Sequence, residues 1–192
     1  MKAIYLIGEP GVGKSTVIRE LYPNLRATTA IRLNKQLWGQ PLKRGHITAG
    51  VMLGKEREGF TGTDALGMSV NPDAIAWCSS QHPYRFIIGE GARLANIAFL
   101  TALSKHTNLT VAYLIADNAA QRREQRSERL GTELQAESWV KGRRTGARNL
   151  AALCTQQGIH TITVDTSTRE PSMIASEIYR STDTHDKGGH ND

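Results

Sequence analysis

The octet at residues 8–15, GEPGVGKS, constrains the fold of this chain more than any other feature of its sequence. It matches the pattern G-x-x-x-x-G-K-[ST], in which a glycine-rich loop points its backbone N–H groups at a phosphate. Gly8, Gly11 and Gly13 let such a loop curl without side-chain clashes. A helix that follows the loop strengthens the anion site with its N-terminal dipole. The octet therefore predicts a strand–loop–helix unit that binds a nucleoside triphosphate.

The residues on either side of the octet agree with this arrangement. Residues 3–7 form an apolar run typical of a short buried strand, and residues 15–21 carry apolar side chains at helical spacing. In this motif Lys14 reaches the outer phosphates and the hydroxyl of Ser15 binds Mg²⁺. We expect ATP and Mg²⁺ at a site formed by Gly8, Glu9, Pro10, Gly11, Val12, Gly13, Lys14, Ser15 and Thr16.

Strands and helices alternate along the rest of the chain. Apolar runs predict further strands at 25–31, 85–90, 109–116 and 159–164. Helical patterns predict helices at about 71–77, 94–103, 119–130, 136–157 and 171–179. The alternation predicts an α/β fold with a five-stranded parallel sheet and helices on both faces. Ligands of such sheets bind at the carboxyl ends of the strands.

We expect one domain over residues 1–180, followed by a polar, disordered tail at 181–192. An aperiodic, glycine-rich insert at about 38–64 is long enough to suggest a role in substrate binding. Cys78 and Cys154 lack metal or redox spacing and are interpreted as buried thiols. We find no run that could span a bilayer and no signal peptide, so we expect a cytoplasmic protein without a membrane partner.

The charge balance favours an anionic partner. Twenty-four Lys and Arg against eighteen Asp and Glu give a formal net charge of +6. Much of the excess lies at residues 122–129 and 141–148, clusters that can serve ATP as well as DNA. Charge alone does not separate free nucleotides from a nucleic acid.

Two classes of P-loop protein are disfavoured. A GTPase usually carries an Asn-Lys-x-Asp motif, but the nearest match, residues 34–37, ends in leucine and lies too early in the chain. An oligomeric ATPase motor is normally longer and ends a strand in paired acids, whereas the strand at 85–90 ends in Glu90 alone. A small phosphotransferase with a P-loop kinase fold remains.

The segment Glu90-Gly91-Ala92-Arg93 is similar to an acidic-Gly-x-Arg segment that small-molecule and nucleotide kinases place over the acceptor. Glu90 would then hold the metal's water shell or the acceptor hydroxyl, and Arg93 would balance phosphate charge. The alternative is a glutamate that starts a helix beside a solvated arginine.

Residues 118–135 predict an arginine-rich lid. Kinases close such lids over ATP, which excludes water and stabilises charge on the moving phosphoryl group. We assign a catalytic role to Arg126 and a nucleotide-binding role to Arg122. An ordinary solvated helix, with Glu124 and Glu128 among the arginines, is the alternative. The other candidates, for the lid, its hinge or the adenine, are Arg123, Arg129, Arg143, Arg144 and Arg148.

Asp64 lies in the insert that is expected to reach the acceptor. Its carboxylate is a candidate general base for an acceptor hydroxyl. A structural aspartate that caps the next helix is the alternative.

Three segments carry a resemblance to a known family: GFTGTDALGMSVNPDAIAW at 59–77, EGARL at 90–94 and SWVKGRRT at 138–145. Together with the octet, they resemble small P-loop kinases encoded by bacterial viruses and described as thymidylate-kinase-like. Some of these phosphorylate 5-hydroxymethyluracil in DNA, a step towards hypermodified thymidines that protect the viral genome from host restriction. The resemblance covers most of residues 1–180 and implies ATP, Mg²⁺ and the usual roles of Lys14 and Ser15, in the cytoplasm of the host cell.

The resemblance leaves the acceptor open. The chain lacks the Asp-Arg-Tyr/His segment typical of thymidylate kinases, which weakens the interpretation as a kinase of free pyrimidine nucleotides. A base in DNA would have to be flipped out or already unpaired to react. A basic rim at Lys43, Arg44, His46, Lys55 and Arg57 could hold the strand, and Trp38, Phe60 and Trp77 either stack on the base or pack in the core. The third hypothesis is a P-loop NTPase without a phosphate acceptor.

Overall fold

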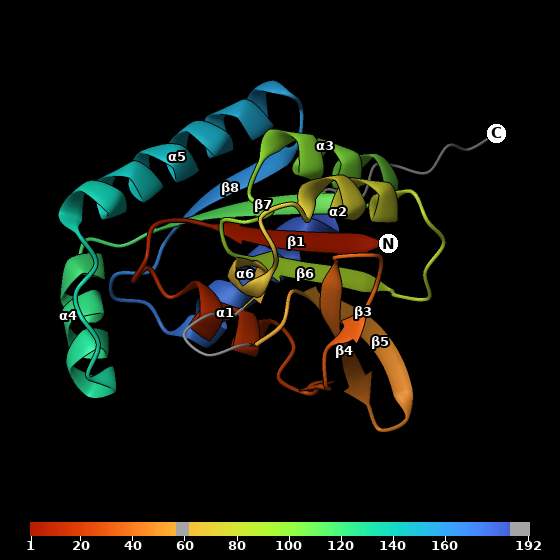
Figure 1. Ribbon diagram of the computed structural model, residues 1–192, viewed down its shortest axis with the longest axis horizontal. Coiled ribbons are helices and arrows are strands. Elements are labelled where there is room, and N and C mark those ends of the chain that lie inside the picture. The colour runs from red at the N-terminus through yellow and green to blue at the C-terminus, as the bar shows by residue number, and fades with distance from the viewer. Residues whose placement is uncertain (57–61, 185–192) are drawn as a thin grey trace.

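The computed structural model describes residues 1–56 and 62–184 as a sheet with helices on both faces (Figure 1). Within that part of the chain, eight strands form one mixed sheet in the order β2-β4-β5-β6-β1-β7-β8, with β3 paired to β4. The strands are β1 (Lys2–Ile7), β2 (Arg26–Ala27), β3 (Ile31–Arg32), β4 (Trp38–Arg44), β5 (Ile47–Leu53), β6 (Phe86–Glu90), β7 (Asn108–Ile115) and β8 (His160–Asp165).

Five of these strands, from β5 through β6, β1 and β7 to β8, run parallel. The helices are α1 (Lys14–Leu21), α2 (Asn71–Cys78), α3 (Ile97–His106), α4 (Ala119–Leu130), α5 (Glu137–Gln156) and α6 (Pro171–Thr184), with a 3-10 turn η1 at Gly62–Ala65. The expected α/β architecture with a five-stranded parallel core is therefore confirmed, although the sheet also has an antiparallel side.

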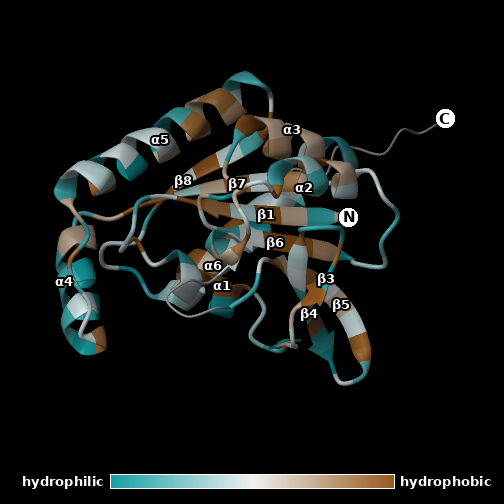
Figure 2. Cartoon of the chain, viewed as in Figure 1, coloured by the Kyte–Doolittle hydropathy of each residue, from teal (hydrophilic) through white to brown (hydrophobic). Residues whose placement is uncertain are grey.

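Alternate residues of β1 explain the layers. Ala3, Tyr5 and Ile7 pack with α2, α3 and α5, whereas Ile4 and Leu6 pack with α1 and α6 on the other face. Both faces are buried, so the strand is continuously apolar, as expected for a central parallel strand. Figure 2 shows the hydrophobic residues along the central strands and a largely hydrophilic α4 at one end of the sheet.

The second parallel strand does not lie at residues 25–31 as predicted. That segment forms only β2 and β3, which are exposed and pair antiparallel with β4. The fifth parallel strand is β5, inside the supposedly aperiodic insert, where β4 and β5 form a hairpin. Buried and exposed residues do not alternate along these two strands, and β4 contains proline and glycine, so the sequence showed no strand pattern there.

Two other details differ from the sequence interpretation, and a third decides between two alternatives that it left open. Helix α3 begins at Ile97 rather than Leu94, because the Asn96 side chain accepts the N–H of Phe99 at 3.0 Å and caps the helix there. Helix α6 continues through residues 181–184, which were expected to be disordered. Trp77 is buried in the core and Trp38 packs against it, so Trp77 is no stacking platform. Arg57, Phe60 and residues 185–192 lie outside the described residues.

Candidate active site

The glycine-rich loop connects β1 to α1 at the middle of the parallel sheet. Residues 8–13 form the loop, and Lys14, Ser15 and Thr16 form the first turn of α1. Gly11 has φ +90°, and a Cβ atom there would lie 2.4 Å from the carbonyl oxygen of Ala119. Only glycine fits this position, because the start of α4 closes over the loop.

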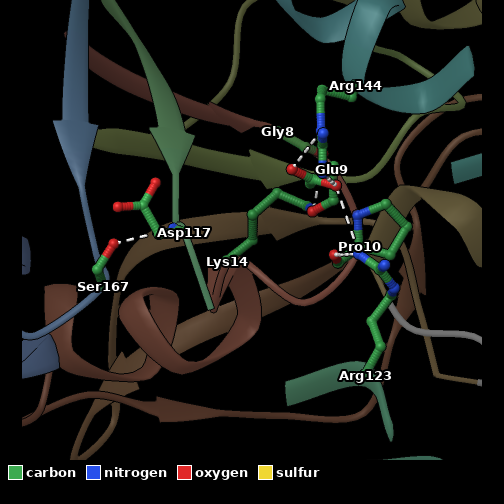
Figure 3. Close-up of polar contacts among 8 residues, drawn as sticks. All are labelled: Gly8, Glu9, Pro10, Lys14, Asp117, Arg123, Arg144 and Ser167. Carbon is green, nitrogen blue, oxygen red and sulfur yellow. Dashed lines mark hydrogen bonds and ion pairs between the residues drawn. The ribbon is translucent and has the colours of Figure 1, made fainter. Parts of the chain in front are cut away.

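Lys14 turns back over the loop that precedes it (Figure 3). Its Nζ atom donates to the carbonyl oxygens of Gly8 and Glu9, at 3.0 and 2.9 Å. Burial lowers the pKa of Lys14, while the nearby charges of Glu90 and Asp64 oppose that shift. The amino group of Lys14 thus lies inside the loop, and the carboxylates of Glu90, Asp64 and Glu9 favour its charged form there.

Glu90 ends β6 beside the first turn of α1. The hydroxyl of Ser15 donates to Oε1 of Glu90 at 2.6 Å, and the Glu90 residue is 7% exposed. Burial raises the pKa of Glu90, while the hydrogen bond from Ser15 and the positive charge of Lys14 oppose that shift. Since α3 begins at Ile97, the alternative of a glutamate that starts a helix is wrong.

Asp64 lies in η1, opposite the residues that follow β6. Its Oδ1 atom accepts the N–H of Ala92 at 2.8 Å, and no hydrogen bond to a described residue uses Oδ2. The alternative of a cap on the next helix is wrong, because α2 has Val70 as its N-cap and no side-chain capping bond. Asp64 instead holds the loop after β6 and keeps one carboxylate oxygen available.

Two buried hydroxyl groups, which no sequence pattern indicated, hold this edge together. The hydroxyl of Tyr5 donates to the carbonyl of Gly91 at 2.8 Å, and the hydroxyl of Thr63 donates to the carbonyl of Glu90 at 2.8 Å. Both side chains are fully buried, and burial raises the pKa of Tyr5. These hydroxyls fix η1, and with it Asp64, against the end of β6.

Glu9 lies between arginines from two helices, as Figure 3 shows. Arg144 of α5 donates from Nε and Nη2 to the two carboxylate oxygens at 2.8 and 3.0 Å. Arg123 of α4 approaches one of them at 3.4 Å and also donates to the carbonyl of Pro10 at 3.2 Å. The carboxylate of Glu9 therefore holds α4 and α5 against the loop, which is a role that the sequence did not indicate.

Arg122 contacts the loop that follows β8. Its Nη2 atom donates to the carbonyls of Thr166 and Ser167 at 2.7 and 3.1 Å, and its Nη1 atom lies near Gly13. Thr166 is buried and donates from Oγ1 to the carbonyl of Val12 at 2.8 Å. The end of β8 thus borders the nucleotide loop, and Arg122 spans the two.

The comparison with known proteins agrees with this geometry. The family model described as P-loop Nucleotide Kinase3 matches residues 1–182. The chain belongs to the P-loop Nucleotide Kinase3 family. No curated protein matches the sequence. Membership in this family makes the octet the nucleoside triphosphate loop of a kinase, and it leaves the acceptor of this Nucleotide Kinase3 member unspecified.

The remaining lid arginines of the Nucleotide Kinase3 chain differ in position. Arg126 is exposed on α4, yet its positive charge partly opposes the burial that raises the pKa of Glu90. Arg143 lies 5.2 Å from the ring centre of Trp139, and its positive charge adds to the burial that lowers the pKa of Lys14. Arg129 and Arg148 make no hydrogen bond or ion pair with a described residue. The predicted group of arginines is therefore divided between loop contacts and free side chains.

Arg93 lies in the segment that follows β6 at the same edge of the sheet. Its Nη1 atom contacts the sulfur of Met68, while its Nε atom is buried without a hydrogen-bond partner in the described part of the chain. A buried donor that lacks a partner is costly, so an anionic ligand that accepts a hydrogen bond from Nε would be favourable here.

Among the described residues, no helix is long and apolar enough to cross a membrane.

Proposed function

We propose that this Nucleotide Kinase3 member transfers the γ-phosphoryl group of ATP to the hydroxymethyl group of 5-hydroxymethyluracil in viral DNA. The observation that carries the proposal is that two carboxylates lie at the carboxyl edge of the sheet beside the nucleotide loop. Glu90 accepts the hydroxyl of Ser15 at 2.6 Å, and Asp64 accepts the N–H of Ala92, two residues after Glu90, at 2.8 Å. A kinase needs carboxylates at this place to orient an alcohol and a metal ion. The reaction would be a step towards hypermodified thymidine, which protects phage DNA from restriction.

The transfer is a displacement at phosphorus. The acceptor oxygen forms a bond to the γ-phosphorus while the bond between that phosphorus and the β–γ bridging oxygen breaks, and ADP leaves. The free Oδ2 atom of Asp64 takes the proton of the acceptor hydroxyl. Lys14 would exchange its bonds to the carbonyls of Gly8 and Glu9 for phosphate oxygens. Arg126 would add positive charge from the lid.

Oxygen donors suit Mg²⁺ at this site. The hydroxyl oxygen of Ser15 and Oε1 of Glu90 lie 2.6 Å apart, and both side chains offer oxygen rather than nitrogen or sulfur as the ligand atom. Mg²⁺ is usually held by one or two such groups together with water and substrate phosphates, so the pair fits the ion. Bound Mg²⁺ would neutralise negative charge on the phosphates.

DNA is preferred to a free nucleotide as the acceptor for two reasons. The chain resembles viral kinases of DNA bases, and it lacks the Asp-Arg-Tyr/His segment of thymidylate kinases. The unpartnered Nε atom of Arg93 adds a donor for an acceptor phosphate, although a phosphate of DNA and one of a nucleotide would serve equally. The choice therefore depends on a direct test.

The test is transfer of label from γ-labelled ATP to three acceptors at equal concentration. They are DNA that contains 5-hydroxymethyluracil, matched DNA that contains thymine, and the corresponding free nucleotides. Label on the hydroxymethyl DNA alone supports the proposal. Label on a free nucleotide would refute it in favour of nucleotide metabolism, and phosphate release without a labelled acceptor would indicate an NTPase.

A further inference from the structure

The antiparallel side of the sheet has an unusual charge composition. Residues 26–55, which comprise β2, β3, β4 and β5 and are called the basic extension here, contain six Lys and Arg, one His and no Asp or Glu. The whole chain has 18 acidic residues, so their absence from this segment concentrates positive charge on one projecting part of the molecule. Figure 1 shows the β4–β5 hairpin extending away from the helices.

The cations of the basic extension are not neutralised by the described part of the chain. None of the six forms an ion pair with a described carboxylate. Arg26 and Lys43 even lie directly opposite each other in the β2–β4 register, where like charges are unfavourable. Arg32 and Lys55 lie 5.2 and 4.8 Å from the ring centre of Trp38 instead of a carboxylate.

The lid cluster contrasts with this arrangement. Arg123 and Arg144 are held by Glu9, and Arg122 is held by backbone carbonyls. Glu124 and Glu128 lie among the arginines of α4. Arg122, Arg123 and Arg144 already have partners around the nucleotide loop, whereas the six cations of the basic extension have no ion-pair partner among the described residues. The basic extension is therefore the better surface for a separate polyanion.

The basic extension is joined rigidly to the acceptor edge. β5 pairs with β6 from Gly50 to Met52, and the N–H of Lys55 donates to the carbonyl of Gly62, next to Asp64 in η1, at 3.2 Å. The seven residues of β4 extend for roughly 20 Å, or about six base-pair steps of a duplex. A two-residue turn with Gly45 at φ +59° closes the far end beside Arg44.

We infer that the basic extension binds the phosphates of duplex DNA that flank the acceptor base. This inference rests on the proposed function, and it assigns DNA binding to β2, β4 and β5 rather than to the arginine-rich lid. Phosphates near Lys43 and Arg26 would relieve the repulsion between these two side chains. The strand that holds the acceptor would continue past Lys55 towards Asp64.

The experiment measures binding to a labelled duplex of about 20 base pairs that contains 5-hydroxymethyluracil, by fluorescence anisotropy between about 50 and 200 mM salt. The test variant combines Arg26→Gln, Lys43→Gln and Arg44→Gln. The control variant combines Arg19→Gln, Lys105→Gln and Arg180→Gln, which remove three exposed positive charges from α1, α3 and α6. Both variants change the net charge by the same amount.

We expect the test variant to bind at least about tenfold more weakly and to reduce the salt slope by about 2 to 3, because each lost phosphate contact lowers it by about 0.9. The control variant should keep the wild-type slope. Binding of ATP by the test variant shows that it is folded. The single variant Lys43→Gln is a second test, and it should still lower the slope of the salt dependence by about 0.9.

Two other results would overturn the inference, and they are distinguishable. If the wild-type protein phosphorylates DNA but the test variant keeps the slope of the control, the surface is wrong and the proposed function stands. If the wild-type protein binds no DNA and labels only free nucleotides, the proposed function fails together with the surface.

Discussion

Replacement of Glu9 by glutamine tests how strongly the nucleotide loop holds α4 and α5. The side chain of Glu9 is 8% exposed, that of Arg123 is 17% exposed and that of Arg144 is 58% exposed. Breaking a fully buried pair costs about 3 to 5 kcal/mol, whereas exposed pairs contribute about 0 to 1 kcal/mol. Arg123 is partly buried and Arg144 is more than half exposed, so we expect an intermediate loss of about 2 kcal/mol in the free energy of unfolding.

In a protein of this length a loss of 1 kcal/mol lowers Tm by about 2 to 4 °C, so Glu9→Gln should lower it by about 4 to 8 °C. Thermal and urea unfolding measure the change. Glu124→Gln on the exposed side of α4 is the matched control, and it should stay within about 0.5 kcal/mol of the wild type.

A double-mutant cycle with Arg144→Gln isolates the pair. Arg144→Gln alone should cost about 1 kcal/mol, because Glu9 keeps Arg123, and the two substitutions should couple by about 1 kcal/mol. Equal losses for Glu9→Gln and Glu124→Gln, or full additivity in the cycle, would refute the idea that Glu9 fastens the two helices to the loop.

Three further predictions concern the residues of the active site. Lys14→Ala should abolish phosphoryl transfer and leave a cooperative unfolding transition, and near-normal turnover would contradict the assignment of the nucleotide loop. Asp64→Asn should lower kcat by at least about tenfold with little change in ATP affinity, and an unchanged rate would return Asp64 to its contact with Ala92 alone. Burial raises the pKa of Glu90 above 4.5, so its contribution to stability is complete below pH 4.5 and declines as pH rises through the raised pKa. Glu90→Gln cannot ionise, and its Tm measured from pH 4.5 to 8 should therefore decline less than that of the wild type, whereas parallel profiles would count against the burial argument.

Local sequence was sufficient where the structural cause is itself local. The octet specifies its turn through glycines and its helix through the residues that follow, and α1 begins at Lys14 within one residue of the prediction. β1, β6 and β7 are largely apolar on both faces, because parallel strands at the centre of a sheet have no exposed side. These features predicted a P-loop kinase fold, which the family match confirms.

Other features depended on partners far away in the chain. β5 is a parallel strand only because β6 lies beside it, and its own glycine and exposed residues did not distinguish it from a loop. Likewise, Glu9 is separated from Arg123 by 114 residues and from Arg144 by 135 residues. No local pattern encodes such pairs, since their geometry exists only after helices have packed at the edge of the sheet. The sequence by itself thus determined the phosphate loop and the type of fold, and tertiary packing decided that Glu90 lies beside Ser15 and that Glu9 binds arginines of α4 and α5.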